Sequence, residues 1–431
     1  MHDFSPEILL ITILSLVIFS DALANKIKIP SVFLLLIGSY LIYTYFKVAV
    51  PIDLKEHFST VILFCIPLIF MGDALHLHFS DIQKHGWSIF YLAVVAVALS
   101  ITAGASLYYL NIFEGLSLGA YVALFAINMA TDAVSVQSVL SQFKGINHDI
   151  KVLIEGESLG NDATAVIAFF FIGLPWMLSG TIDPGRAGIE ALRVFMVSIL
   201  LGVTLGFAFY MMMKLFSNKR GELFAFVVEA YVAYVLAEFL HVSGILTLIV
   251  AIVATKAWID IDLESNDKRK TKSFIRSFRL GGVGATTKER LVYIYEMAKE
   301  FGYIAAVIIF FVLAEMVDFH LLWEYKVEII VMFIITTVIR ALSMAKFAMF
   351  GNVDMLGSIK PVGKEGWFIL TFSGMKGALS IILVHMIPDS YAHKELFEAV
   401  TIGVVVLSIF VYGTTLWTYF TFFKKEEKRL F

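Results

Sequence analysis

Residues 152–178 read VLIEGESLGNDATAVIAFFFIGLPWML. The run is mostly apolar and is long enough to cross the hydrocarbon core of a bilayer as a helix, which takes about 20 residues. It nevertheless contains Glu157, Ser158, Asn161 and Asp162. Ionisable side chains are costly at membrane depth, so where they occur they usually have a function. The stretch therefore predicts a transmembrane helix with a polar site inside the membrane.

The composition of the whole chain indicates a polytopic membrane protein. Of its 431 residues, 59% are hydrophobic and 16% are charged, whereas an ordinary soluble domain has about 25% charged residues. A soluble enzyme, a disordered chain and a nucleic-acid-binding protein are therefore excluded. The net charge of −3 gives no reason to expect a polyanionic partner. We expect a lipid bilayer around the chain, no nucleic acid, no cofactor and no enzyme activity.

Apolar runs divide the chain into thirteen predicted spans. They are too long, and alternate too little in polarity, to be strands of an outer-membrane barrel, so the predicted class is an all-α polytopic membrane protein. We treat residues 1–431 as a single transmembrane domain with a cytoplasmic loop over 259–299. The expected spans are 7–23, 29–46, 59–75, 87–110, 114–141, 152–178, 187–213, 221–240, 243–258, 300–319, 325–349, 365–387 and 395–421.

The distribution of lysine and arginine predicts the orientation. With thirteen spans, most of these residues fall at one set of loop ends, which includes the 259–299 loop and the C-terminal tail. Because cytoplasmic loops carry the excess of positive charge, that side is expected to be the cytoplasm. The N-terminus is then outside and the C-terminus inside, in the cell membrane.

The polar side chains of the sixth span share one broad helix face. Ser158 and Asp162 are four residues apart, as are Glu157 and Asn161, and residues at this spacing are neighbours on a helix. A carboxylate flanked by an amide, a hydroxyl and a second acid is typical of a cation site, because hard cations prefer oxygen ligands. Asp162, Asp132, Ser158, Thr131 and backbone carbonyls can supply such oxygen ligands, so we expect these four residues to form a site for a monovalent cation.

Two spans carry polar breaks in their middle. The fifth span contains Asp132, and the twelfth contains Gly374, Lys376 and Gly377. Broken helices are tolerated at membrane depth where they line a cavity, and their half-helix ends can then face ions. We expect Lys376 to neutralise helix ends at its break. Since spans five and six precede twelve and thirteen by seven positions, the pattern also favours an inverted repeat of six helices.

These motifs resemble those of the cation:proton antiporter-1 family, which comprises microbial sodium/proton exchangers and their animal relatives. The most specific motif is 156–162, and the resemblance covers nearly the whole chain. The other matching motifs are Thr131-Asp132, Ala237-Glu238 with Ser243-Gly244-Ile245, Arg340-Ala341, Gly377-Ala378-Leu379-Ser380 and Gly413-Thr414-Thr415.

The resemblance implies a role for each polar residue. Asp162 would bind a proton and a cation in turn, and Asn161 would mark the electroneutral type of exchanger. Ser158, Thr131 and Asp132 would complete the cation site. Glu157 and Arg340 would form a buried structural ion pair between the sixth and eleventh spans.

The resemblance also implies the fold and the activity. The expected fold has about thirteen helices, inverted six-helix repeats, two broken helices that cross, a core domain and a dimerisation domain. The expected activity is electroneutral exchange of one monovalent cation for one proton by alternating access. Na⁺ is the expected cation, with Li⁺ and K⁺ as alternatives, and the expected assembly is a homodimer.

The chain departs from the family pattern at three positions. Ala133 stands where a proline usually follows Thr-Asp, Lys376 stands where an arginine is usual, and Met71, with Asp73 close by, stands where a glutamate is often found. Lysine is a point charge and cannot reproduce the bidentate fork of arginine. The first two departures bear on the geometry and charge of the helix breaks. The third concerns a residue that would lie around the direct ligands of the cation.

Three other functions remain as alternatives. A cation channel would need a filter sequence, and none is recognised here. A proton-translocating subunit of a respiratory complex carries lysines and glutamates along several spans, whereas here the acids concentrate in spans five and six. A sensor without transport would be separated from all of these by ion flux in liposomes that contain only this protein.

Overall fold

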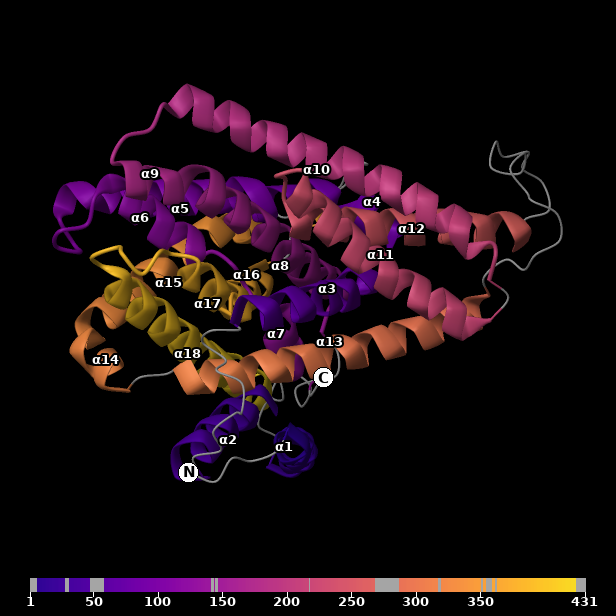
Figure 1. The fold of residues 1–431 in the computed structure, drawn as a ribbon, viewed down its shortest axis with the longest axis horizontal. Coiled ribbons are helices and arrows are strands. Elements are labelled where there is room, and N and C mark those ends of the chain that lie inside the picture. Colours follow the sequence, from indigo (N-terminus) through magenta and orange to yellow (C-terminus); the bar gives the residue numbers. More distant parts are fainter. Residues whose placement is uncertain are drawn as a thin grey trace. The chain divides into compact units, whose positions relative to one another are not determined.

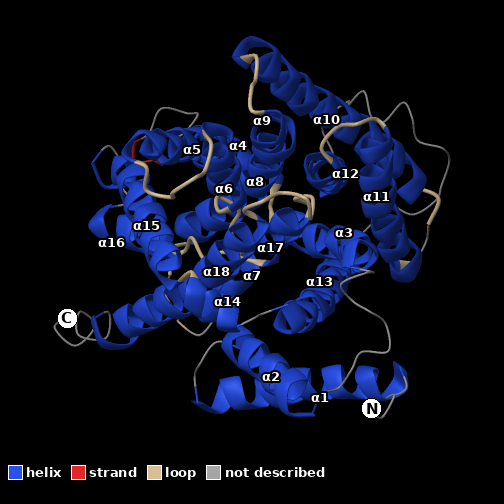
Figure 2. Ribbon diagram, turned by 60° about the vertical axis from the view of Figure 1, so that its left-hand side comes forward, coloured by secondary structure: helices blue, strands red, loops and turns tan. Residues whose placement is uncertain are grey.

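The computed structural model is almost entirely helical over the residues that it describes (Figure 2). These are 6–27, 31–46, 58–140, 143, 146–216, 218–267, 287–316, 319–349, 352–353, 359–360 and 363–423. Turns and loops join the helices, and the described residues include one two-residue antiparallel pair, in which Asn352–Val353 (β1) lies against Ile359–Lys360 (β2). The predicted all-α class is confirmed.

A helix, or a run of consecutive helices, lies at each of the thirteen predicted ranges (Figure 1). Among the described residues, six helical segments are by length and composition sufficient to cross a membrane. The helices are α1 (Pro6–Ile27), α2 (Ser31–Phe46), α3 (Phe58–His76), α4 (Phe79–Phe90), η1 (Tyr91–Val95), α5 (Ala96–Ser106), η2 (Leu107–Leu110), α6 (Leu118–Ile127), α7 (Ala133–Leu140), α8 (His148–Ala168), η3 (Phe169–Gly173), α9 (Leu174–Ser179), α10 (Pro184–Met213), α11 (Lys219–Phe239), α12 (Gly244–Asp267), α13 (Lys288–Met316), α14 (Phe319–Glu324), α15 (Lys326–Met349), α16 (Gly363–Phe372), α17 (Ala378–His385), α18 (Lys394–Thr418) and η5 (Tyr419–Phe423).

Two helices extend into the segment that was expected to be a loop. α12 continues to Asp267 and α13 begins at Lys288, so both ends of the 259–299 segment are helical, while 268–286 lie outside the described residues. Hydropathy marks only the apolar part of a helix, and polar turns can continue beyond it. Asp262 supports the added turns of α12, because the Tyr210 hydroxyl donates to its carboxylate at 2.7 Å.

The chain clusters into two compact units. The first unit comprises Met1–Ile62, Lys84–Ala191 and Ala306–Phe431, and the second comprises Leu63–Gln83 and Leu192–Ala305. The first unit therefore includes all the residues expected to form the cation site and its ion pair. The second unit includes α11, α12 and most of α3, α10 and α13.

The first unit contains the two broken helices. α6 and α7 are separated by 128–132, and α16 and α17 by 373–377. Each broken pair is followed in the chain by a long helical segment, α8 with η3 and α9 in one case and α18 in the other. An apolar cluster formed by α7, α8, α15, α16 and α18 packs beside the breaks and includes Leu153, Phe347 and Tyr412.

In the second unit, two glycines bring α10 close to α12. A Cβ atom on Gly202 would lie 2.7 Å from the Thr247 carbonyl oxygen, and one on Gly206 would lie 2.6 Å from the Ala251 carbonyl oxygen. This spacing of small residues permits close helix packing in membrane proteins. Backbone groups of α10 therefore lie within hydrogen-bonding reach of side chains on α12.

Candidate cation site

The two broken helices meet at their breaks. The backbone N–H of Asp132 donates to the Met375 carbonyl at 2.8 Å. A Cβ atom on Gly377 would lie 2.5 Å from the Asp132 Cβ atom, so only glycine fits there without a shift. The predicted crossing of the fifth and twelfth spans is thus present in the structure, and it satisfies backbone groups that the breaks remove from helices.

Side-chain hydroxyls reinforce this crossing. Ser380 on α17 donates to the carbonyl of Ile127, the last residue of α6, at 2.8 Å. Ser408 on α18 accepts from the backbone N–H of Lys376 at 2.8 Å. Ser380 belongs to a motif already identified in the sequence. The backbone groups that these two serines contact, the Ile127 carbonyl and the Lys376 N–H, could not be identified from the sequence.

Thr131 connects the first break to α8 through three of its polar groups. Its backbone N–H donates to Asp162 Oδ1 at 3.0 Å, and its carbonyl accepts from the Ser158 hydroxyl at 2.9 Å. Its own hydroxyl accepts from Asn161 Nδ2 at 2.8 Å. All four residues are buried. The structure therefore brings Thr131 of the first break into one hydrogen-bonded group with Ser158, Asn161 and Asp162 of α8.

Asp132 lies at the edge of this group, immediately before α7. It is only partly buried, and its carboxylate accepts a very short hydrogen bond from the Ser135 hydroxyl. This contact fixes the Asp132 carboxylate against the first turn of α7. Ser135 was not among the expected site residues, and no motif in the sequence pointed to it.

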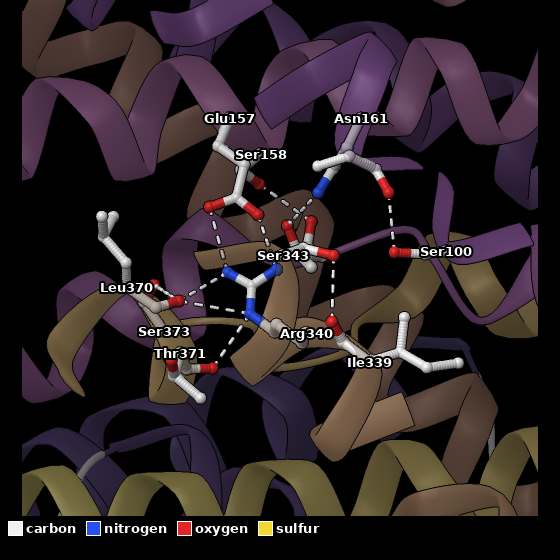
Figure 3. A network of polar contacts seen from close by, with 12 residues as sticks. Ser100, Glu157, Ser158, Asn161, Ile339, Arg340, Ser343, Leu370, Thr371 and Ser373 are labelled. Carbon is white, nitrogen blue, oxygen red and sulfur yellow. Dashed lines mark hydrogen bonds and ion pairs between the residues drawn. The ribbon is translucent and has the colours of Figure 1, made fainter. Parts of the chain in front are cut away.

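Glu157 and Arg340 form the ion pair that the resemblance implied (Figure 3). Arg340 Nη1 donates to Glu157 Oε1 at 2.6 Å, and Nη2 donates to Oε2 at 3.0 Å. The contact is bidentate, which gives both energy and a defined geometry. It connects α8 to α15 within the first unit.

Arg340 also holds the end of α16. Its Nε donates to the Thr371 carbonyl at 2.9 Å and its Nη2 to the Leu370 carbonyl at 2.8 Å (Figure 3). Carbonyls in the last turn of a helix lack helical partners, so a buried guanidinium is well suited to satisfy them. A Cβ atom on Gly374 would lie 2.2 Å from Arg340 Nε, so the break must be glycine at this position.

A small cavity of about 20 Å³ lies beside the Glu157–Arg340 pair and Asn161. That volume is sufficient for about one water molecule. Asn161 lines it, and its Oδ1 atom is buried with no hydrogen-bond partner among the described residues. The other polar residues of the lining are Ser100, Glu157, Thr336, Arg340, Ser343 and Lys376. The buried Lys376 thus lies at the second break, as expected, and close to the ion pair.

The remaining departures from the family pattern lie elsewhere. Met71 is fully buried on α3 in the second unit, and Asp73 follows on the same helix. Ala133 begins α7, and its side chain lies outside the described part of the structure. Around the first break, Asp162, Asp132 and their hydroxyl neighbours bring several oxygen atoms together. Such a set can hold a monovalent cation or a proton.

Comparisons with known proteins identify the family and the fold. The family model described as sodium/hydrogen exchanger, transmembrane, matches residues 10–421. The Na(+)/H(+) antiporter NhaH of Halobacillus aidingensis is 26% identical over 432 residues, which cover 96% of each chain. The antiporter MjNhaP1 of Methanocaldococcus jannaschii has the same fold, with a TM-score of 0.70 at 17% identity, over 94% of this chain and 99% of that one.

Two further relatives are longer than this chain. The Na(+)/H(+) antiporter ApNhaP of Aphanothece halophytica is 26% identical over 83% of this chain and 63% of its own length. The Na(+)/H(+) exchanger beta of Oncorhynchus mykiss is 25% identical over 77% of this chain and 40% of its own length.

Proposed function

The chain belongs to the sodium/hydrogen exchanger family, and we propose that it exchanges Na⁺ for H⁺ across a membrane. Asp162 is the proposed carrier, binding one proton or one cation at a time. The observation that supports this proposal best is its setting: a buried carboxylate on α8 that is hydrogen-bonded to the break of a second helix, where two broken helices cross.

The neighbours of Asp162 have distinct proposed roles. Thr131, Ser158 and Asp132 supply further oxygen ligands to the cation, because each lies in or beside the hydrogen-bonded group. Asn161 contributes a neutral amide, which orients Thr131 and does not titrate. With one titrating group at the carrier position, the proposed stoichiometry is one cation for one proton.

Glu157, Arg340 and Lys376 are proposed to act on the scaffold. The Glu157–Arg340 pair holds α8, α15 and the end of α16 together while the carrier changes charge. Lys376 places a positive charge at the second break, where carbonyl groups would otherwise face an apolar interior. Neither role requires contact with the transported ion.

The assembly and orientation are also proposals. The protein is a multi-pass membrane protein by its family and its apolar helices. We propose that it forms a homodimer in the cell membrane, with the N-terminus outside and the C-terminus in the cytoplasm, from the resemblance and from the distribution of lysine and arginine.

Flux through the purified protein tests the proposed exchange. The protein is placed in liposomes with an imposed Na⁺ gradient and a pH-sensitive dye in the lumen. We expect Na⁺ movement in one direction to drive H⁺ movement in the other. Asp162→Asn, which keeps the shape but cannot titrate, should insert normally and abolish the signal.

Three outcomes would contradict the proposal. Exchange at near wild-type rate in Asp162→Asn would show that the carrier is another group. Na⁺ flux without any opposing H⁺ flux would instead favour a channel, and no flux of either ion in a folded protein would favour a sensor. Replacing Na⁺ by Li⁺ or K⁺ in the same assay determines the preferred cation.

A further inference from the structure

Two buried glutamates lie on α11 in the second unit, away from the proposed carrier in the sequence. Glu222 and Glu229 are seven residues apart, which places them about two turns apart on the same helix face. Both side chains have 0% exposure. Glu222 forms an ion pair with Arg290, whose Nη1 donates to its Oε1 atom at 3.0 Å.

Glu229 has a different environment. Its Oε1 atom lies 2.5 Å from the Thr255 hydroxyl oxygen on α12. The same hydroxyl oxygen lies 2.9 Å from the Gly206 carbonyl oxygen on α10, which the close packing of these helices brings within reach. The Glu229 Oε2 atom is buried and has no hydrogen-bond partner among the described residues.

The neighbouring charged and titratable groups are engaged elsewhere. Lys256 follows Thr255 on α12, but its Nζ atom donates to the carbonyls of Leu75 and Leu77. On α10, the Tyr210 hydroxyl donates to Asp262. Arg290, on α13, pairs with Glu222 of α11 rather than with Glu229. None of the ion pairs found in the described part of the second unit includes Glu229.

Counting the available protons decides whether Glu229 is ionised or protonated. The Thr255 hydroxyl has one proton for two acceptors. If Glu229 were ionised, a buried negative charge would have at most one neutral donor and a second oxygen with none, and such a charge normally neutralises. If Glu229 is protonated, its own O–H donates to Thr255, and the Thr255 hydroxyl donates to Gly206.

We propose that Glu229 is a proton-binding site that keeps its proton throughout the transport cycle. The ligand is H⁺, and the bound proton completes a chain of hydrogen bonds from α11 through Thr255 to the backbone of α10. The site differs from Asp162 in function, because its proton is structural and is not exchanged for a cation. It also differs from Glu222, which pairs with Arg290.

Infrared spectroscopy of the purified full-length protein tests this site. The carbonyl stretch of a protonated carboxylic acid is separate from that of an ionised carboxylate. We expect a protonated-carboxyl band that disappears in Glu229→Gln and persists in the matched control Glu222→Gln. The band should remain unchanged when Na⁺ is added to saturation and when the pH is raised from neutral to mildly alkaline.

A second variant keeps the proposal testable if Glu229→Gln does not fold. Thr255→Val removes the hydrogen-bond acceptor, so the band should shift in frequency, whereas Thr255→Ser should leave it in place. Glu229→Gln, where it folds, should keep the wild-type exchange rate and melting temperature, because a neutral amide replaces a neutral acid.

Three results would overturn the proposal. The first is a wild-type spectrum in which no protonated-carboxyl band depends on Glu229 or Thr255. The second is a Glu229 band that vanishes when Na⁺ saturates the protein, which would make its proton part of the exchange. The third is a folded Glu229→Gln protein whose exchange rate falls as far as that of Asp162→Asn.

Discussion

Thr131, in the first break, makes three hydrogen bonds to α8. Its amide, carbonyl and hydroxyl bond Asp162, Ser158 and Asn161 respectively. Two of these three contacts use backbone atoms, so they are available to any residue type. Only the hydroxyl contact requires threonine or serine, and this difference makes the position informative to mutate.

Replacement of Thr131 tests that distinction at the residue scale. Thr131→Val keeps the size and both backbone contacts but leaves Asn161 Nδ2 without its acceptor. That unsatisfied buried donor costs about 1–3 kcal/mol of folding stability. The variant also removes a proposed oxygen ligand of Na⁺, and a loss of about 1.4 kcal/mol of binding free energy corresponds to a tenfold change in affinity. We expect the apparent KM for Na⁺ to rise about tenfold or more. Thr131→Ser is the control and should be close to wild type; equal behaviour of the two variants would exclude a role for the hydroxyl.

At the scale of elements, Arg340 joins three helices. It lies on α15, pairs with Glu157 on α8, and donates to the last-turn carbonyls of α16. Gly374 permits this arrangement because no side chain fits between the break and the guanidinium. The position of the second break relative to α8 therefore depends in part on one arginine and on the absence of one Cβ atom.

A double-mutant cycle measures the coupling between these elements. Removing one partner of a buried ion pair costs about 3–5 kcal/mol, because the other charge is left without compensation. Glu157→Ala and Arg340→Ala should each lower the melting temperature in detergent, and their effects should be strongly non-additive. Arg340→Ala should be the more harmful, since it also releases the α16 carbonyls. Additive losses in the double variant would mean that the pair contributes no coupling energy.

At the scale of the whole molecule, the proposed mechanism gives one carboxylate two ligands. If Asp162 binds either H⁺ or Na⁺, the two ions compete, and alternating access converts that competition into exchange. The rate should then be bell-shaped in pH. Protons displace Na⁺ from the site at low pH, whereas proton binding limits the cycle at high pH.

Initial rates over a grid of Na⁺ concentrations and symmetrical pH values test this competition. As the pH falls, more of the carrier is protonated by mass action, so the apparent KM for Na⁺ rises. Saturating Na⁺ should therefore restore the rate on the acidic limb and leave the alkaline limb unchanged. An acidic limb that persists at saturating Na⁺ would require a separate pH sensor.

The charge moved per cycle is the second property of the whole molecule. In the proposed mechanism Asn161 takes the place of a second titrating acid, so one positive charge would leave for each one that enters. A membrane potential alone, set with K⁺ and valinomycin, should drive no exchange when the Na⁺ and H⁺ gradients are zero. Flux driven by the potential would reject the one-for-one stoichiometry. A different clamp is needed if K⁺ itself is transported.

Much of this molecule follows from the sequence alone. Hydropathy is a local property, so the apolar runs located the helices, and the four-residue spacing of Ser158 and Asp162 placed them on one face of α8. The breaks were visible because glycines and polar residues interrupt apolar runs. Helix ends were predicted less well, as the extension of α12 to Asp267 shows, because a helix can continue into water after its apolar part ends.

Only the tertiary structure decided which groups face each other across the breaks. The Met375 carbonyl that receives Asp132, and the α16 carbonyls that receive Arg340, are backbone atoms, which every residue has and no sequence motif marks. The same holds for Glu229. The sequence shows an acid within an apolar helix, but whether that acid is paired or protonated depends on the side chains and carbonyls that α10 and α12 bring to it.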